Sequence, residues 1–246
     1  DPQGVDVPGN TGNPRASCES CHGNAPHEKT KLNEHVDQVA CQTCHIPAFA
    51  RGGVATKTWW DWSTAGTLGE DGKPLTIRDA DGNIEYLSTK GTFRHGENVI
   101  PEYRWFDGIS RYTLREDKID DTQTPIHLNQ IKGSHDNPDS RIWPFKIMEG
   151  KQPYDKVHKH LLVNHVYSAD DDTALWTNFD WVKSLKAGTE YAGQEYSGEF
   201  DFIETRMHWP LAHMVAPAED ALNCGSCHAR DGRLAALTDF YLPGRD

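Results

Sequence analysis

The sequence lacks three things: cysteines outside short motifs, long apolar runs and an excess of positive charge. All six cysteines fall in three C-x-x-C-H motifs, so we expect no disulfide even in an oxidising compartment. No segment approaches the roughly 18–20 apolar residues that a membrane-spanning helix needs. The formal net charge is −12, from 37 acidic and 25 basic residues. This balance argues against nucleic acid or an anionic membrane surface as a partner.

What the sequence does contain is the motif itself. Two copies lie close together, at residues 18–22 and 41–45, and a third lies at residues 224–228. C-x-x-C-H is the attachment signature of c-type haem, in which both cysteines form thioethers and the histidine binds the iron. The sequence therefore predicts three covalent haem c groups. Their attachment points are Cys18, Cys21, Cys41, Cys44, Cys224 and Cys227, and their proximal ligands are His22, His45 and His228.

The cysteine spacing also fits two other kinds of site. The first two pairs also fit a four-cysteine zinc site, and a single pair could be a redox dithiol. A zinc ribbon leaves the third pair idle, and neither alternative explains why a histidine follows every pair directly. Covalent haem is the interpretation that uses all three motifs.

The apolar content is low, with 36% hydrophobic residues and a mean hydropathy of −0.73. Three porphyrins would supply much of the missing buried surface. We therefore expect a multihaem cytochrome c fold, mainly α-helix and irregular coil wrapped around covalent haems, with a small β-hairpin. Residues 1–246 would form a single trihaem domain. Its expected parts are an extended arm (1–16), a two-haem part (17–48), a long insertion covering the haems (49–207) and a third-haem part (208–246).

Local patterns place the remaining elements. Asp-Gly turns within residues 69–95 predict the hairpin. The proline-containing stretch 99–156 predicts a loop over a haem face. Helices are expected at 155–167 and at 172–187, the second capped by Asp172 and ended by Gly188. The tryptophans at positions 59, 60 and 62 fit either stacking on a porphyrin or an ordinary core.

Bis-histidine ligation needs a second histidine at each iron. His27, His35 and His213 each lie within eleven residues of a motif, on short tethers, and are the expected distal ligands. His95 and His208 are reserve candidates, as are His127 and His165. Bis-histidine haems have low potentials, which suits electron transfer, whereas methionine ligation would raise the potential.

Compartment and partners follow from the chemistry of attachment. Covalent haem is attached outside the cytoplasm, and the chain opens without a signal peptide. We expect an exported protein, periplasmic or extracellular, with its leader removed, or a piece of a longer protein. Its negative charge suits redox proteins or other haem-bearing chains as partners, and a homo-oligomer or filament stays open.

Several stretches resemble one known family. Residues 40–51, 57–63, 139–146, 150–155 and 209–217 are similar to the C-terminal half of the octahaem tetrathionate reductase family. That resemblance implies a periplasmic protein with mostly bis-histidine haems, related to enzymes that reduce tetrathionate. The family's catalytic haem carries a lysine in a C-x-x-C-K motif, and no such motif occurs here. The resemblance therefore implies the electron-conducting half without the catalytic centre.

Three functions remain open from the sequence. The favoured one is a trihaem cytochrome that carries electrons, with no catalytic residue assigned. The alternatives are a reductase of tetrathionate or nitrite-type substrates with an open haem site, or part of one, and a subunit of an extracellular haem filament.

Overall fold

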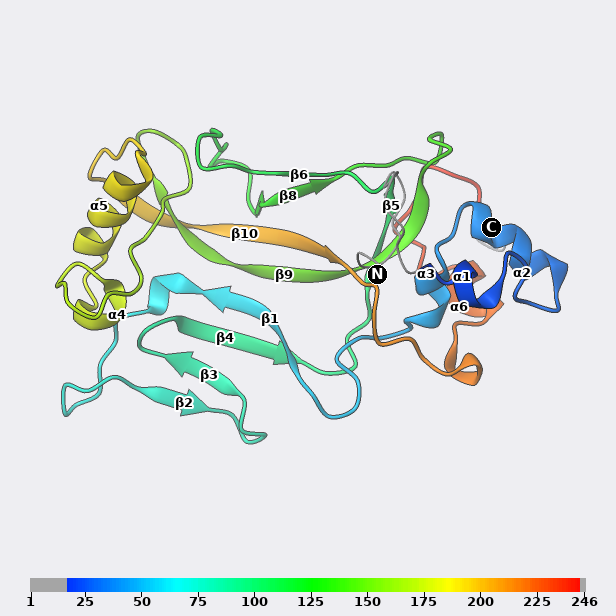
Figure 1. The fold of residues 1–246 in the computed structure, drawn as a ribbon, viewed down its shortest axis with the longest axis horizontal. Coiled ribbons are helices and arrows are strands. Elements are labelled where there is room, and N and C mark those ends of the chain that lie inside the picture. Colours follow the sequence, from blue (N-terminus) through cyan, green and yellow to red (C-terminus); the bar gives the residue numbers. More distant parts are fainter. Residues whose placement is uncertain (1–16, 244–246) are drawn as a thin grey trace.

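A long antiparallel strand pair forms the centre of the molecule (Figure 1). The computed structural model describes residues 17–243. In it, strand β9 (Arg141–Asp155) pairs with β10 (Phe200–Pro210) without a break, from Phe200 opposite Asp155 to Pro210 opposite Phe145. The expectation of a mainly helical and coil fold is therefore wrong. The expected arm at 1–16 lies outside the described residues.

Around this pair lies an eight-stranded mixed sheet. Its order is β2-β3-β4-β1-β9-β10-β7, and β5 also pairs with β9. Strand β1 runs parallel to β9, and β7 runs parallel to β10. The pairs β1–β4, β5–β9 and β9–β10 are antiparallel. The bounds are β1 (Thr56–Asp61), β2 (Thr76–Arg78), β3 (Ile84–Leu87), β4 (Gly91–Gly96), β5 (Glu102–Phe106) and β7 (Ile126–His127). Strands β6 (Ser110–Tyr112) and β8 (Asn129–Ile131) form a separate two-stranded sheet.

The predicted hairpin is present but is one part of this sheet. Strands β2 and β3 pair antiparallel across residues 79–83. The Asp79 carboxylate accepts the backbone N–H groups of Asp81 and Asn83, which fixes the turn. Strand β4 pairs with β3 on one side and with β1 on the other. The hairpin predicted from the Asp-Gly turns is therefore the edge of a much larger sheet.

Helices α4 (Leu175–Asn178) and α5 (Trp181–Ala192) cover the end of the sheet that lies far from the motifs (Figure 1). The helix predicted at 172–187 is wrong at both ends. Asp180 caps α5 by accepting the Lys183 N–H, and Gly193, in the left-handed conformation, ends it. Gly188 lies inside the helix and does not end it. The position requires glycine because a Cβ there would be 2.4 Å from the carbonyl oxygen of Val163.

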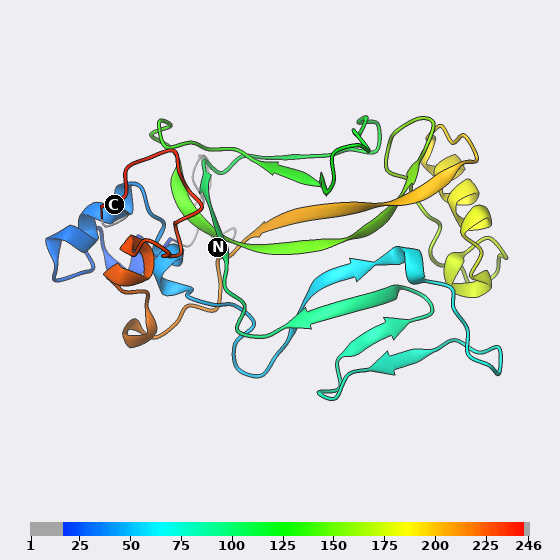
Figure 2. The same ribbon diagram turned by 180° about the vertical axis from the view of Figure 1, so that it is seen from behind.

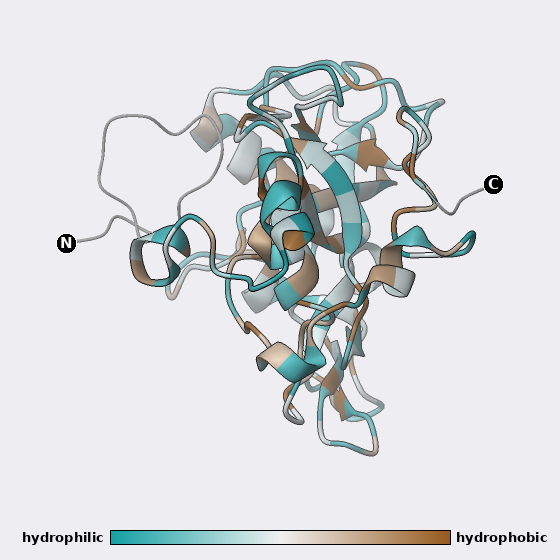
Figure 3. Ribbon diagram, turned by 90° about the vertical axis from the view of Figure 1, so that its right-hand side faces the viewer, coloured by the Kyte–Doolittle hydropathy of each residue, from teal (hydrophilic) through white to brown (hydrophobic). Residues whose placement is uncertain are grey.

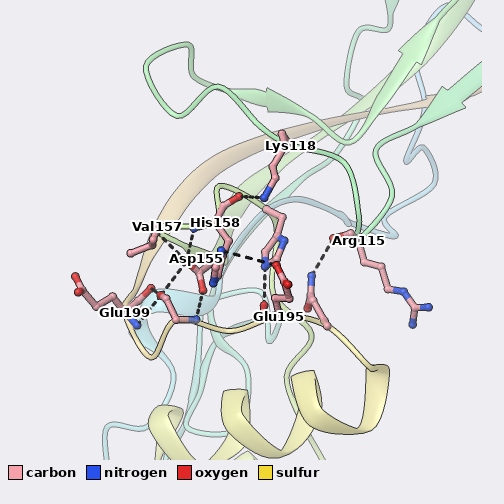
Figure 4. Close-up of polar contacts among 10 residues, drawn as sticks. Arg115, Lys118, Asp155, Val157, His158, Glu195 and Glu199 are labelled. Carbon is pink, nitrogen blue, oxygen red and sulfur yellow. Dashed lines mark hydrogen bonds and ion pairs between the residues drawn. The ribbon is translucent and has the colours of Figure 1, made fainter.

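The helix predicted at 155–167 is absent, and a buried carboxylate takes its place (Figure 4). Asp155 ends β9 and accepts N–H groups from Val157 and His158, at 2.8 and 2.7 Å. It also accepts the N–H and the hydroxyl of Ser197, at 2.7 and 2.9 Å. These bonds hold a turn at 155–159 against the loop that leads into β10. After the turn the chain runs back along β9, where the Leu162 N–H donates to the carbonyl of Pro153, and so it does not continue as a helix.

The three motifs lie together at the opposite end, with the C-terminal segment (Figures 1 and 2). Figure 3 views the molecule from this end, where many ribbon residues are hydrophilic (teal). The short elements here are α1 (Glu19–His22), α2 (Thr30–Glu34), η1 (His35–Asp37), α3 (Cys41–His45), η3 (Ala218–Asp220) and α6 (Cys224–His228). A further 3-10 turn, η2 (Trp62–Thr64), follows β1.

Apolar and polar contacts join this end to the sheet. The Thr43 hydroxyl donates to the carbonyl oxygen of Ile142 at 2.7 Å, and the Ala40 N–H donates to the same oxygen. Leu234 and Leu242, which follow the third motif, are buried against the aromatic residues Tyr103 and Trp105 of β5. The start of β9 and the strand β5 therefore serve as the platform on which the motif helices sit.

Candidate haem sites

Motifs that are far apart in sequence become neighbours in space. The backbone carbonyl of Cys44 accepts the N–H of Leu222, and the carbonyl of His45 accepts the N–H of Ala216, at 3.0 and 2.8 Å. The segment that leads into the third motif is thus bonded directly to the second one. The 179 residues between Cys44 and Cys224 form the sheet and return the chain to its starting point.

None of the six cysteines forms a disulfide, and none is fully buried. Burial raises the pKa of Cys44 to about 11, and the neighbouring Cys227 adds to the shift. Burial likewise raises the pKa of Cys41 to about 11, and Cys18 of the first motif adds to the shift. Thiols from different motifs therefore lie within electrostatic reach of one another. Paired thiols held at the start of a short helix, with a histidine at its end, fit the chemistry of a covalent porphyrin.

Two predicted distal histidines lie opposite motif histidines. The ring of His27 is 6.0 Å from that of His45 between centroids, with planes 19° apart. The rings of His35 and His228 are 6.1 Å apart, with planes at 80°. Two imidazoles bound to one metal, each through a bond of about 2 Å, place their ring centroids roughly 6 Å apart. Both pairs therefore have the spacing of axial ligands on either side of an iron.

The ring nitrogens of these histidines are oriented for metal binding. The Nδ1 atoms of His35 and His228 lie 2.7 Å from the carbonyl oxygens of Lys31 and Pro243. His27 Nδ1 lies 3.1 Å from the side-chain oxygen of Asn33. A metal-bound histidine almost always donates its other N–H to such an oxygen, which fixes the ring and leaves Nε2 for the metal. Nothing in the motifs themselves identifies Asn33 or Pro243 as these supporting residues.

Burial and the nearby histidines lower the pKa of His45 below its ordinary value. Burial is the larger cause, and the charges of His27 and His22 add to it. The neutral imidazole, which is the form that binds a metal, is thereby favoured at neutral pH. The electrostatics of this end thus agree with the ligand role predicted for His45.

The structure places the other candidate histidines elsewhere. His22 is exposed, and no ring pair within residues 17–243 joins it to another histidine. His213 lines a hollow on the sheet, and His95 lies on β4 within that sheet. His208 is 2% exposed on β10, stacked on His127 at 5.6 Å. The roles predicted for His213, His95 and His208 stay predictions.

Ring spacing alone does not make a ligand pair. His158 and His160 lie 5.8 Å apart, but the Nε2 atom of His160 is bonded to the carbonyl oxygen of Glu195 (Figure 4). This pair also lies at the far end of β9 from every motif (Figure 1). The His27 and His35 pairs differ because a motif histidine forms one side of each.

Two comparisons with known proteins found a match. A family model described as bacterial cytochrome c matches residues 57–231. The chain is also similar to a solved structure described as octaheme cytochrome c from Shewanella oneidensis, with 38% identity and a TM-score of 0.83. The match covers 93% of this chain and 52% of that one, so the chain spans about half the length of this relative. No curated protein matches the chain.

Proposed function

Because this chain belongs to the bacterial cytochrome c family, we propose that it is a trihaem electron carrier with its haems grouped at one end. The family and the octahaem relative make it a multihaem redox cytochrome with covalent haem c. The number three is supported by three motifs that use all six cysteines. The observation that carries the proposal is the pairing of two motif histidines with two tethered histidines at axial-ligand spacing.

The pairs support a specific ligand assignment. His45 and His27 would hold the second haem, and His228 and His35 the third. His27 follows the first motif and His35 precedes the second, so each distal ligand reaches the next haem along the chain. Such cross-ligation keeps neighbouring haems at short distances. When bound, each haem supplies a one-electron iron couple, and the protein orients its ligands and limits its contact with water.

A second candidate function is reduction of a small substrate at the first haem. It is favoured by His22, which is exposed and has no ring partner among residues 17–243. An open sixth position is what such a reaction needs. The resemblance to the C-terminal half of the tetrathionate reductase family does not add to this function, because that half conducts electrons and the chain has no C-x-x-C-K motif.

Export and redox partners complete the proposal. Covalent haem requires attachment outside the cytoplasm, which supports a periplasmic or extracellular location. Among residues 17–243, no helix has the length and apolar character to cross a membrane. The net charge of −12 suits docking to basic redox proteins.

Electron paramagnetic resonance of the oxidised protein tests the ligand assignment. Near-parallel imidazole planes, as for His27 and His45, split the two iron dπ orbitals strongly and give a rhombic low-spin signal. Near-perpendicular planes, as for His35 and His228, leave those orbitals almost degenerate and give a more anisotropic low-spin signal. We expect both signals, and a third haem that is high-spin if its sixth position is open.

Single substitutions assign each signal to its haem. His27→Ala should remove the rhombic signal alone, and His35→Ala the anisotropic signal alone. His158→Ala, in the histidine pair at the far end, is the matched control and should change neither. If His27→Ala and His35→Ala leave both low-spin signals intact, the assignment is wrong.

A further inference from the structure

One face of the sheet carries a hollow of about 570 Å³, and its lining contains no residue of the three motifs but includes His213, a predicted distal ligand. Its floor is formed by β9 and β10, where Met148 lies directly opposite Met207 and Lys146 opposite Trp209. Side chains two residues apart on a strand share a face, so these four belong to one surface. Gly150 lies two residues further along β9, where the backbone of β1 packs so closely that a Cβ would be 2.1 Å from the carbonyl oxygen of Trp60.

A β-bulge completes this surface from the side of β1. The register of β1 against β4 shifts between Lys57 and Trp59. Without the bulge, Lys57 and Trp60 would point to opposite faces, because their spacing is odd. The extra residue places Lys57 on the same wall of the hollow as Trp60 and Trp62. The bulge therefore brings a cation and two indole rings to one place.

The aromatic residues provide flat, accessible walls. Trp60 and Trp62 stack with centroids 4.7 Å apart and planes at 24°. Trp209, on β10, is 49% exposed. Methionine side chains between such walls adapt to the edges of an aromatic ligand. A pocket of this size, mostly apolar with a few polar groups, is typical of a small-molecule site.

The cations in the hollow are not neutralised by the protein. None of the ion pairs within residues 17–243 includes Lys57 or Lys146. The Lys146 ammonium donates to the hydroxyl of Thr56 at 2.5 Å, and the Lys57 ammonium lies over the ring of Phe93. Glu149 also lines the hollow, but its carboxylate pairs with Arg206. Two unpaired ammonium groups stand out in a chain of net charge −12.

We propose that this hollow binds a flat aromatic molecule that carries an anionic group. The ring system would lie between the tryptophans and over the methionines. The anionic group would form ion pairs with the ammonium groups of Lys57 and Lys146, which have no carboxylate partner among residues 17–243. Stacking and charge-assisted hydrogen bonds would both be gained, since the lysine stems are already held by their neighbours. The proposal does not rest on the assignment of His27 and His35 as ligands, because neither residue lines the hollow.

Isothermal titration calorimetry of the oxidised trihaem protein with naphthalene-2-sulfonate tests the site. We expect saturable binding at low ionic strength and none for methanesulfonate, which has the anion without the ring. Lys57→Met and Lys146→Met should each weaken binding by about tenfold, the loss expected for one charged hydrogen bond. Lys146→Arg keeps the charge and should retain most of the affinity.

The matched control is Lys73→Met, at a lysine whose side chain is 79% exposed in a turn outside the hollow. It should bind like the original protein. Each variant must show the far-UV circular dichroism of the original sheet, and Lys146→Arg separates loss of charge from loss of packing. Absence of binding at millimolar probe, or equal affinities for all lysine variants, would overturn the proposal.

Discussion

Replacement of Asp155 gives the sharpest test of how the sheet end opposite the haems is held. The side chain is 0% exposed and accepts four hydrogen bonds, three of them from backbone N–H groups. Asp155→Ala would leave those donors without an acceptor at a buried site. An unsatisfied buried donor costs about 1–3 kcal/mol, and partial entry of water limits the sum to roughly 3–5 kcal/mol. Asp155→Asn keeps the shape and one acceptor, so we expect about 2–3 kcal/mol.

The same carboxylate predicts a pH dependence. Burial would raise the pKa of Asp155, but the donors from His158, Ser197 and Val157 outweigh it and hold the pKa below its ordinary value. A depressed pKa stabilises the fold above the unfolded value of about 3.9 and loses that effect as the pH falls through the folded value. Between pH 6 and 8, about two units or more above the unfolded pKa, the stability difference between the original protein and Asp155→Asn should be constant. Below about pH 4 this difference should shrink.

Guanidinium unfolding followed by far-UV circular dichroism measures these differences. Asp71→Asn is the control, because that side chain is 62% exposed in a turn and should change stability by less than about 0.5 kcal/mol. A loss below about 1 kcal/mol for Asp155→Ala, or a difference that grows at low pH, would refute the reasoning.

Two further predictions concern packing and charge. Gly188→Ala should destabilise the protein by more than about 2 kcal/mol, because its Cβ would meet the Val163 carbonyl at 2.4 Å. Gly193→Ala, where nothing lies within 4 Å but φ is positive, should cost only about 1 kcal/mol, and thermal unfolding compares the two. The ring of His208, whose Nε2 atom lies 3.6 Å from the Glu102 carboxylate, and the nearby Arg104 and Arg206 together hold the pKa of Glu102 at about 2 despite burial. Glu102→Gln should therefore lower stability at neutral pH by about 1–3 kcal/mol, a difference that fades in acid titrations between about pH 4 and 2. Equal stabilities for the two glycine variants, or a Glu102→Gln effect independent of pH, would contradict these assignments.

The haem motifs could be predicted from sequence because covalent attachment needs fixed residues at fixed spacing. The likeness to an octahaem cytochrome could be inferred from stretches such as 139–146, and the solved relative supports it in this coarser form. Which distal histidine faces which motif was not accessible, because the partner of His35 lies 193 positions later in the chain.

The sheet was missed for identifiable reasons. Pro144 and Pro153 lie inside β9, and prolines normally argue against a central strand. Here both prolines sit in the strand and their carbonyls accept N–H groups from Leu211 and Leu162. The alternating pattern of residues 200–209 was the available signal for β10. A low apolar content suggested haem-wrapped coil, whereas extended strands with half-buried faces meet it equally well.

Intact mass under denaturing conditions tests the central claim most directly, because only covalently attached haem survives that treatment. Protein isolated from a host that attaches haem c should show the mass of the polypeptide plus three haem groups. Replacing both cysteines of one motif by serine should remove one haem increment and leave the other two. A mass with two or fewer haems in the original protein would contradict the account of a trihaem cytochrome.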